Sequence, residues 1–176
     1  MLIKLKRRKT TSTKHKVVFI GIGTNKGNRE KNIFFALELL KENKQIKILQ
    51  VSKMLKNPPQ EGIKSGYFLN GAIKIKTTLT PIELLKTLKR IEKKLGRNLN
   101  KQTKRKTSRT IDLDILLYEN KIIKNSFLTI PHPMLHKRSF VLIPLLEIGR
   151  SRIHPIFNKS ISNLYKNYFR AIKKYA

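Results

Sequence analysis

The chain contains no cysteine and no tryptophan among its 176 residues. The absence of cysteine excludes disulfide bonds and thiolate metal sites. No apolar run approaches the roughly 20 residues that a helix needs to span a bilayer. Residues 1–16 lack the apolar segment of a secretory signal. We therefore expect a soluble, cytoplasmic protein that has no contact with a membrane.

Acidic residues are also scarce, with 10 Asp and Glu against 40 Lys and Arg, a formal net charge of +30. Such a chain attracts nucleic acid non-specifically through its phosphates. The lysines are spread along the whole chain, and no helix-turn-helix, zinc-finger or RNP-type aromatic motif is present. We expect no specific nucleic-acid partner, but a small basic nucleic-acid-binding protein stays open as the alternative.

Length and apolar content favour one folded domain. With 39% hydrophobic residues and eight Phe, 176 residues can bury a sizeable core. We expect residues 17–176 to form this domain. Residues 1–16 are basic, rich in Thr and Ser and free of acids, which favours a disordered extension over an organelle-targeting peptide.

The order of elements follows from periodicity and from turn residues. Residues 17–22 form a continuous apolar run typical of a buried strand, and a helix to about residue 43 follows. Further strands are expected at 46–51, 68–75 and 109–117, and a second helix between Thr80 and Gly96. Loops are expected at 57–66 and 97–108, the second strongly cationic.

This order, strand–helix–strand–strand–helix–strand, predicts an α+β, ferredoxin-like (split βαβ) fold. We expect a four-stranded antiparallel sheet, with both helices on one face and the opposite face free for ligands. Residues 118–176 are expected to form an extension without a second core. It would hold a short helix at 138–149 and an amphipathic helix within 161–176.

The strand at 109–117 carries two acids on one side. Alternation directs Ile111, Leu113 and Ile115 to one face and Asp112 and Asp114 to the other. Neighbouring carboxylates repel each other unless a cation lies between them, and hard divalent cations prefer such oxygen ligands. Paired acids on a strand at a sheet edge can also serve only to prevent edge-to-edge association.

Several cations precede this pair along the chain, including Arg97 and Arg109. Alone, Arg97 could simply follow a helix end, where a cation is favoured anyway. Carboxylates that bind a divalent cation beside a group of arginines are typical of polyphosphate chemistry. The pattern therefore favours a metal and a phosphorylated substrate over a role in edge protection.

Motifs spread over residues 17–148 resemble the 6-hydroxymethyl-7,8-dihydropterin pyrophosphokinase family of folate biosynthesis. The matching pieces are Gly23-Thr24-Asn25-x-Gly27, Asn57-Pro58-Pro59, Tyr67-Phe68-Leu69-Asn70, Glu92, Gly96-Arg97, Arg109-Thr110-Ile111-Asp112-Leu113-Asp114-Ile115-Leu116, Ile130-Pro131-His132-Pro133 and Arg138-Ser139-Phe140. The resemblance implies a monomeric enzyme that transfers pyrophosphate from ATP to a pterin hydroxymethyl group and releases AMP.

The resemblance also implies roles for individual residues. Asp112 and Asp114 would bind two Mg²⁺, and Arg97 and Arg109 would contact the phosphates during transfer. The other ATP-binding residues would be Ile115, Thr129, His132 and Arg138. The pterin pocket would consist of Asn57, Pro58, Phe68, Asn70 and Phe140. In this pocket, the two aromatic rings would sandwich the pterin and Asn70 would hydrogen-bond its edge.

Some positions differ from the family pattern or allow a simpler interpretation. Residues 106–108 read Lys-Thr-Ser where the family usually has an aromatic residue followed by Gly-Pro. Phe68 and Phe140 could be ordinary core residues, as most Phe are. Gly23 and Asn25 are expected to shape a turn and to take no part in catalysis.

Overall fold

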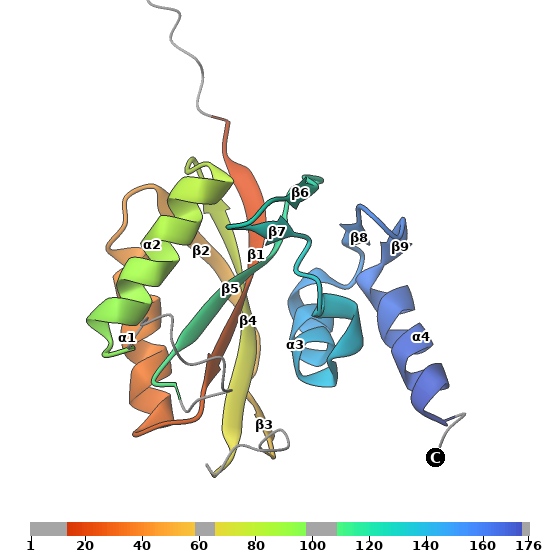
Figure 1. The fold of residues 1–176 in the computed structure, drawn as a ribbon, viewed down its shortest axis with the longest axis horizontal. Helices are drawn as coiled ribbons and strands as arrows, with labels where there is room; N and C mark the ends of the chain where they lie inside the picture. Colours follow the sequence, from red (N-terminus) through yellow and green to blue (C-terminus); the bar gives the residue numbers. More distant parts are fainter. Residues whose placement is uncertain (1–13, 59–65, 98–108, 174–176) are drawn as a thin grey trace, which may run out of the picture.

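The computed structural model describes residues 14–58, 66–97 and 109–173, which form an antiparallel sheet with helices on both faces (Figure 1). The main sheet contains β1 (Lys16–Thr24), β2 (Ile46–Val51), β3 (Leu55–Asn57), β4 (Phe68–Thr77) and β5 (Asp112–Tyr118). The helices are α1 (Arg29–Lys41), α2 (Pro81–Lys94), α3 (Ser139–Gly149) and α4 (Ile161–Lys173). Smaller elements are β6 (Ile123–Lys124), β7 (Thr129–Ile130), the 3₁₀ helix η1 (Leu135–Lys137), β8 (Ile153–His154) and β9 (Lys159–Ser160).

The strand order is β2-β4-β1-β5, with β3 also paired to β4. All of these pairings are antiparallel. The expected α+β class and antiparallel sheet are therefore confirmed, and the short strand β3 was not expected. Most of the two expected loops, and of the extension at 1–16, lie outside the described residues.

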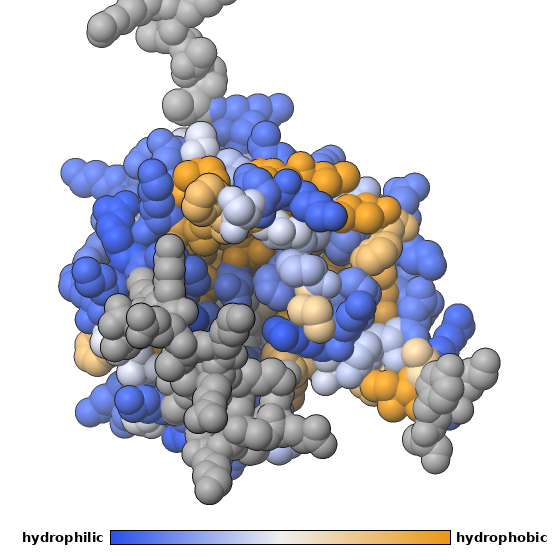
Figure 2. Space-filling view, in the orientation of Figure 1, coloured by the Kyte–Doolittle hydropathy of each residue, from blue (hydrophilic) through white to orange (hydrophobic). Residues whose placement is uncertain are grey.

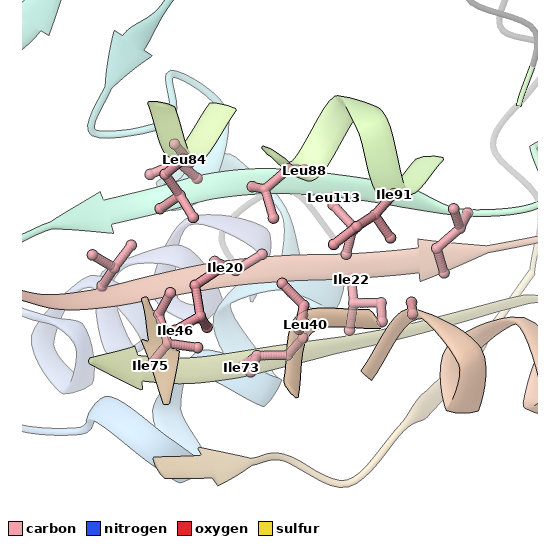
Figure 3. Close-up of a cluster of buried hydrophobic side chains, with 14 of the residues drawn as sticks. Ile20, Ile22, Leu40, Ile46, Ile73, Ile75, Leu84, Leu88, Ile91 and Leu113 are labelled. Atoms are coloured by element: carbon pink, nitrogen blue, oxygen red, sulfur yellow. The ribbon is translucent and has the colours of Figure 1, made fainter. Parts of the chain in front are cut away.

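Helices α1 and α2 cover one face of the sheet. The Asn28 side chain caps α1 by accepting from the Lys31 amide at 2.9 Å. Thr80 and Glu83 form the expected capping box at the start of α2. Figure 3 shows the core that results, in which the helix side chains meet the strand side chains Ile20, Ile22, Ile46, Ile73, Ile75 and Leu113.

Helices α3 and α4 and a second hydrophobic core occupy the other face, so the prediction of a single core and of a free opposite face is wrong. The buried residues of this second core are Phe19, Ala72, Leu116, Leu117, Leu135, Leu142, Leu145, Ile148, Ile161 and Leu164. The sheet residues Phe19 and Ala72 are apolar on this face, and α3 is apolar enough to cover them. The end of this face near Gly23 and Asp112 is not covered by the second core.

Strand β5 begins three residues later than expected and contains an irregularity. Its pairing with β1 shifts between Phe19 and Ile20, so Phe19 pairs with Leu117 and Ile20 pairs with Ile115. The bulge places Leu116 and Leu117 together in the second core, whereas strict alternation would separate them. Within the described residues, no helix is long and apolar enough to cross a membrane.

Candidate active site

The site lies at the end of the sheet where three strands place polar residues in one row. Gly23 of β1 pairs with Asn70 of β4 on one side and with Asp112 of β5 on the other. Gly21 pairs with Asp114 in the same way. Because Gly23 has no side chain, the Asn70 side chain can lie over β1 at this point, whereas the Leu116 side chain lies over Gly21.

A cavity of about 120 Å³ opens at this row. It is lined by Gly23, Thr24, Asn25, Asn57, Phe68, Asn70, Arg109, Asp112, Arg138 and Phe140. Four of the five residues expected to bind a pterin are therefore together, and they meet the expected phosphate-binding arginines Arg109 and Arg138. Asn70 donates through its amide nitrogen to the side-chain oxygen of Asn57 at 2.5 Å.

Gly23 allows this arrangement. A Cβ at Gly23 would lie 2.7 Å from the side-chain oxygen of Asn70. That distance is far below van der Waals contact, so a larger residue would displace the Asn70 amide from the cavity. Gly23 therefore matters for more than the turn that we expected it to form.

Asp112 is held by two arginines. Arg97 donates to its Oδ1 and Arg109 to its Oδ2. Burial alone would raise the pKa of Asp112, but the positive charges of Arg109, Arg97 and Lys89 outweigh it and lower the pKa. Asp112 is therefore ionised. Arg97 and Arg109, which we expected to contact phosphate, both lie beside this carboxylate.

Asp114 has a different environment. Its side chain is 43% exposed and faces the cation of Lys89, with 3.8 Å between Oδ1 and Nζ. Desolvation in the cleft and repulsion from Asp112 raise the pKa of Asp114. Two adjacent acids that repel each other in this way suit a divalent cation, which prefers oxygen ligands and would remove the repulsion.

The described residues contain no group of three or more His, Cys, Asp or Glu side chains arranged to bind a metal. A cation at Asp112 and Asp114 would therefore need further oxygen ligands from water or from a phosphorylated substrate. Mg²⁺ binds in this way in many phosphoryl-transfer sites, with one or two carboxylates and several substrate oxygens.

A buried acid, Glu92 of α2, supports the site from behind. Its Oε1 accepts from Lys89 Nζ at 2.8 Å and from the Leu113 amide at 2.7 Å, and it lies 2.7 Å from Arg97 Nη1. The bond to Leu113 satisfies a donor on the open edge of β5. Burial raises the pKa of Glu92, and its neighbouring cations oppose this shift. Sequence reasoning included Glu92 in a family motif without assigning it a role.

Asn25 and Arg29 position Arg109. The Asn25 side-chain oxygen accepts from the Arg109 backbone amide at 2.6 Å, and the Asn25 backbone amide donates to the Arg109 carbonyl at 3.2 Å. Arg29 donates to the Asn25 carbonyl at 3.2 Å and to the Tyr67 carbonyl at 2.8 Å. Its guanidinium carbon also lies 4.3 Å from the centroid of the Tyr67 ring. Sequence reasoning missed Arg29, since an arginine in the first turn of a basic helix gives no distinguishing signal.

His132 and Arg138 lie on the side of the second core. Both line a smaller cavity of about 70 Å³, together with Asp112, Asp114 and Phe140. Burial lowers the pKa of His132, and nearby Asp114 opposes the shift. The His132 amide donates to the Leu116 carbonyl at 3.0 Å, which fixes this segment against β5.

Four expected site residues do not line either cavity. Arg97 is hydrogen-bonded to Asp112 but is not part of either lining. Pro58 is exposed, and Thr129 lies in β7, paired with Lys124. Ile115 is buried in the core beneath α1 and α2. Any contact between Ile115 and a nucleotide would therefore have to use its backbone.

The alternative of a nucleic-acid-binding sheet predicts exposed aromatic rings on the central strands. Phe19 of β1 is instead buried in the second core. Phe68 of β4 lines the cavity beside Asn70. On the described strands, the aromatic residues therefore do not form an open stacking surface.

Comparison with known proteins identifies close relatives. The sequence profile of the 7,8-dihydro-6-hydroxymethylpterin-pyrophosphokinase (HPPK) family matches residues 19–150. The chain is 40% identical over 144 residues to the Aquifex aeolicus 2-amino-4-hydroxy-6-hydroxymethyldihydropteridine pyrophosphokinase, covering 82% of this chain and 87% of that protein. It is 39% identical over 132 residues to the Bacillus subtilis protein of the same name, covering 75% and 77%.

Other relatives are longer. The folic acid synthesis protein fol1 of Schizosaccharomyces pombe is 40% identical over 147 residues, which are 84% of this chain and 20% of that protein. A solved chain of Plasmodium falciparum HPPK-DHPS is 18% identical with a TM-score of 0.71, covering 92% of this chain and 46% of that chain. The chain thus spans about half the length of that solved structure. At 18% identity, the likeness between the two structures supports the fold alone.

The family profile covers the segment that carries the acid pair, and the two bacterial relatives match over most of the chain. The expected family resemblance is therefore confirmed. The chain belongs to the HPPK family, the ATP-dependent pyrophosphokinases that transfer pyrophosphate to a hydroxymethyl dihydropterin in folate biosynthesis.

Proposed function

We propose that the cavity binds the pterin and that the arginines and acids at its mouth bind the triphosphate of ATP. The observation that carries this proposal is the cavity itself, in which Phe68, Phe140 and Asn70 adjoin Arg109 and Asp112. A flat heteroaromatic ring needs aromatic faces for stacking and polar groups at its edge. Phe68 and Phe140 provide the faces, and Asn70 and Asn57 the edge contacts. Pro58 does not line the cavity, but its carbonyl accepts from the Asn57 side chain at 3.1 Å, so we assign it a role in orienting that edge contact.

The triphosphate is bound on the β5 side of this pocket. Arg97, Arg109, His132 and Arg138 contact its oxygens, and the backbone of Ile115 together with Thr129 contacts the nucleoside. Arg97 and Arg109 are both hydrogen-bonded to Asp112, so their guanidinium groups are already oriented before the substrate arrives. Pre-oriented cations are effective in phosphoryl transfer because they need little reorganisation during the reaction.

Asp112 and Asp114 would hold Mg²⁺, which we expect to be two ions, together with oxygens of the triphosphate. When bound, the metal ions neutralise phosphate charge and polarise the phosphorus that is attacked. The chain's own residues then have three tasks. Phe68 and Phe140 orient the pterin, Arg109 stabilises negative charge on the transferred group, and the enclosed cavity excludes water.

The remaining inferences concern the whole chain. The order β2-β4-β1-β5, with α1 and α2 on one face, supports a ferredoxin-like arrangement in which β3 extends the β2 edge. We further propose that the protein acts as a monomer in the cytoplasm, with ATP and a hydroxymethyl pterin as its only partners.

An AMP-release assay with ATP and 6-hydroxymethyl-7,8-dihydropterin tests the proposal. AMP should form only when the pterin and Mg²⁺ are both present. Asp112→Asn should reduce the rate at least a hundredfold, because it weakens both the metal site and the orientation of the two arginines. Thermal unfolding of the variant provides the folding control. Mg²⁺-independent release, or an unchanged rate in Asp112→Asn, would contradict the proposed roles.

A further inference from the structure

Lys89 reaches the acid pair from the opposite side of the sheet. It belongs to α2, which covers the first core, yet its ammonium lies 3.8 Å from Asp114 Oδ1 at the edge of β5. The same nitrogen lies 2.8 Å from Glu92 Oε1 and donates to the Leu113 carbonyl at 3.4 Å. Its side chain is 34% exposed, so solvent and small molecules can reach it.

The two acids of the pair are neutralised separately. Asp112 has Arg97 and Arg109 as partners. Asp114 forms its ion pair with Lys89, and among the described residues no other cation lies within 4.0 Å of its carboxylate. In this structure, Lys89 therefore provides the positive charge at the carboxylate where a divalent cation is expected to bind.

Glu92 explains how Lys89 can occupy this place and also leave it. Glu92 is fully buried and fixed by Leu113 and Arg97, so it is a rigid anchor for the ammonium. A lysine ammonium has three hydrogen-bond donors on a flexible side chain. It can therefore keep one partner while it exchanges a second partner for a different one. Lys89 can therefore keep Glu92 as a partner while it exchanges Asp114 for a different anion.

We propose that Lys89 competes with the divalent cation for Asp114 and turns to the triphosphate when metal and nucleotide bind together. This inference rests on the proposed function, in which the triphosphate lies beside Asp112 and Asp114. It makes metal binding weak in the absence of nucleotide. Metal and nucleotide binding are then positively coupled, since each removes an unfavourable interaction for the other.

A purely structural lysine would behave differently. Because Glu92 is fully buried, loss of its ion pair with Lys89 would lower the stability of the fold. A purely structural effect of this kind would change the affinities for both ligands in the same direction or not at all. Competition for Asp114 instead requires opposite effects on metal and nucleotide.

Lys89→Met separates the two possibilities. In a calorimetric titration of nucleotide-free protein with Mn²⁺ as the probe metal, the variant should bind about tenfold more tightly than wild type. In a titration with Mg²⁺ and a non-hydrolysable ATP analogue, it should bind about tenfold more weakly. Lys89→Arg retains the charge and should restore both affinities towards wild type.

Lys93→Met is the matched control, because Lys93 lies one turn further along α2 and is exposed. Both affinities should be unchanged in it. The proposal is overturned if Lys89→Met leaves Mn²⁺ affinity unchanged or weakens both ligands together. It is also overturned if Lys89→Arg, which should fold normally, already has the altered affinities. Neither titration requires turnover, so failure of AMP release in wild type would contradict the proposed function separately.

Discussion

At the residue scale, the site depends on what is absent from β1. Gly23 leaves the space that the Asn70 side chain occupies, and the Leu116 side chain lies over Gly21. The two glycines are not equivalent, because a Cβ at Gly23 would lie 2.7 Å from an amide oxygen of Asn70, whereas a Cβ at Gly21 would lie 3.3 Å from a methyl group of Leu116. Their different neighbours allow a paired test of the pterin pocket.

Gly23→Ala should weaken pterin binding by about tenfold to a hundredfold, because the displaced Asn70 amide loses its hydrogen bond to the ligand. Fluorescence titration with the pterin measures this change. Gly21→Ala, with a Cβ 3.3 Å from the Leu116 side chain, serves as the control and should bind nearly as tightly as wild type. Equal effects from the two variants would argue against an edge contact by Asn70.

The same scale shows where sequence reasoning ends. The acid pair and its arginines were proposed from the charge pattern of the sequence, and the pterin-binding residues from the family resemblance. The structure places most of them around one cavity. Glu92, Lys89 and Arg29 act through contacts between α2, β5 and the loop after β1, and such contacts leave no local pattern. Lys89 is one of many lysines in the chain, so its contact with Asp114 could not be recognised from the sequence.

At the element scale, strand alternation and helix caps predicted the first layer, including α1, α2 and the faces of β5. The second layer was missed because residues 139–149 and 161–173 read as isolated helices with no indicated partner. Their partner is the face of the sheet that carries Phe19 and Ala72, which we expected to be free for ligands. The bulge in β5 was also unforeseen, because regular alternation gives no warning of an extra residue.

If the second layer belongs to the same cooperative unit, Leu145→Ala should lower the free energy of unfolding by about 2–5 kcal/mol. Leu145 is fully buried against the sheet, as Leu84 is on the opposite face. Urea unfolding followed by circular dichroism should give similar losses for Leu145→Ala and Leu84→Ala. A global transition unchanged by Leu145→Ala would mean that α3 and α4 unfold independently.

The β8–β9 hairpin provides a prediction about pH. Burial, with a smaller contribution from the charge of His136, lowers the pKa of His154 to about 4. The unfolded chain binds this proton near pH 6.5 and the folded chain does not. Stability should therefore fall as pH decreases from about 6.5 towards 4, by at most about 1.4 kcal/mol per pH unit from this group.

Urea unfolding at several pH values measures this slope. His154→Asn keeps a side-chain acceptor for the amides of Ile156 and Phe157 but removes the titrating group. The variant should show a flatter pH dependence over this window, whereas the exposed-residue control His15→Gln should retain the wild-type slope. An identical slope in His154→Asn would show that other groups cause the acid sensitivity.

At the scale of the whole molecule, the dominant property is charge. The chain carries a net charge of +30, and the face shown in Figure 2 is mostly hydrophilic. Such a surface attracts polyanions of every kind, including its own substrate. Charge alone therefore does not distinguish a pyrophosphokinase from a nucleic-acid-binding protein, and the cavity and family membership do.

Binding to an unstructured RNA should accordingly be weak, and the logarithm of its association constant should fall linearly with the logarithm of salt concentration. Fluorescence anisotropy between 50 and 200 mM salt measures this dependence. Asp112→Asn should leave the RNA affinity essentially unchanged, since the acid pair takes no part in it. Tight binding that persists at high salt, or preference for one sequence, would revive the alternative function.

The most direct measurement is a crystal structure with Mg²⁺, a non-hydrolysable ATP analogue and 6-hydroxymethyl-7,8-dihydropterin. The account predicts metal density shared by Asp112, Asp114 and phosphate oxygens, with the pterin ring between Phe68 and Phe140. Its hydroxymethyl oxygen should point at the β-phosphorus. A triphosphate bound away from the two acids, or a pterin outside the two rings, would contradict it.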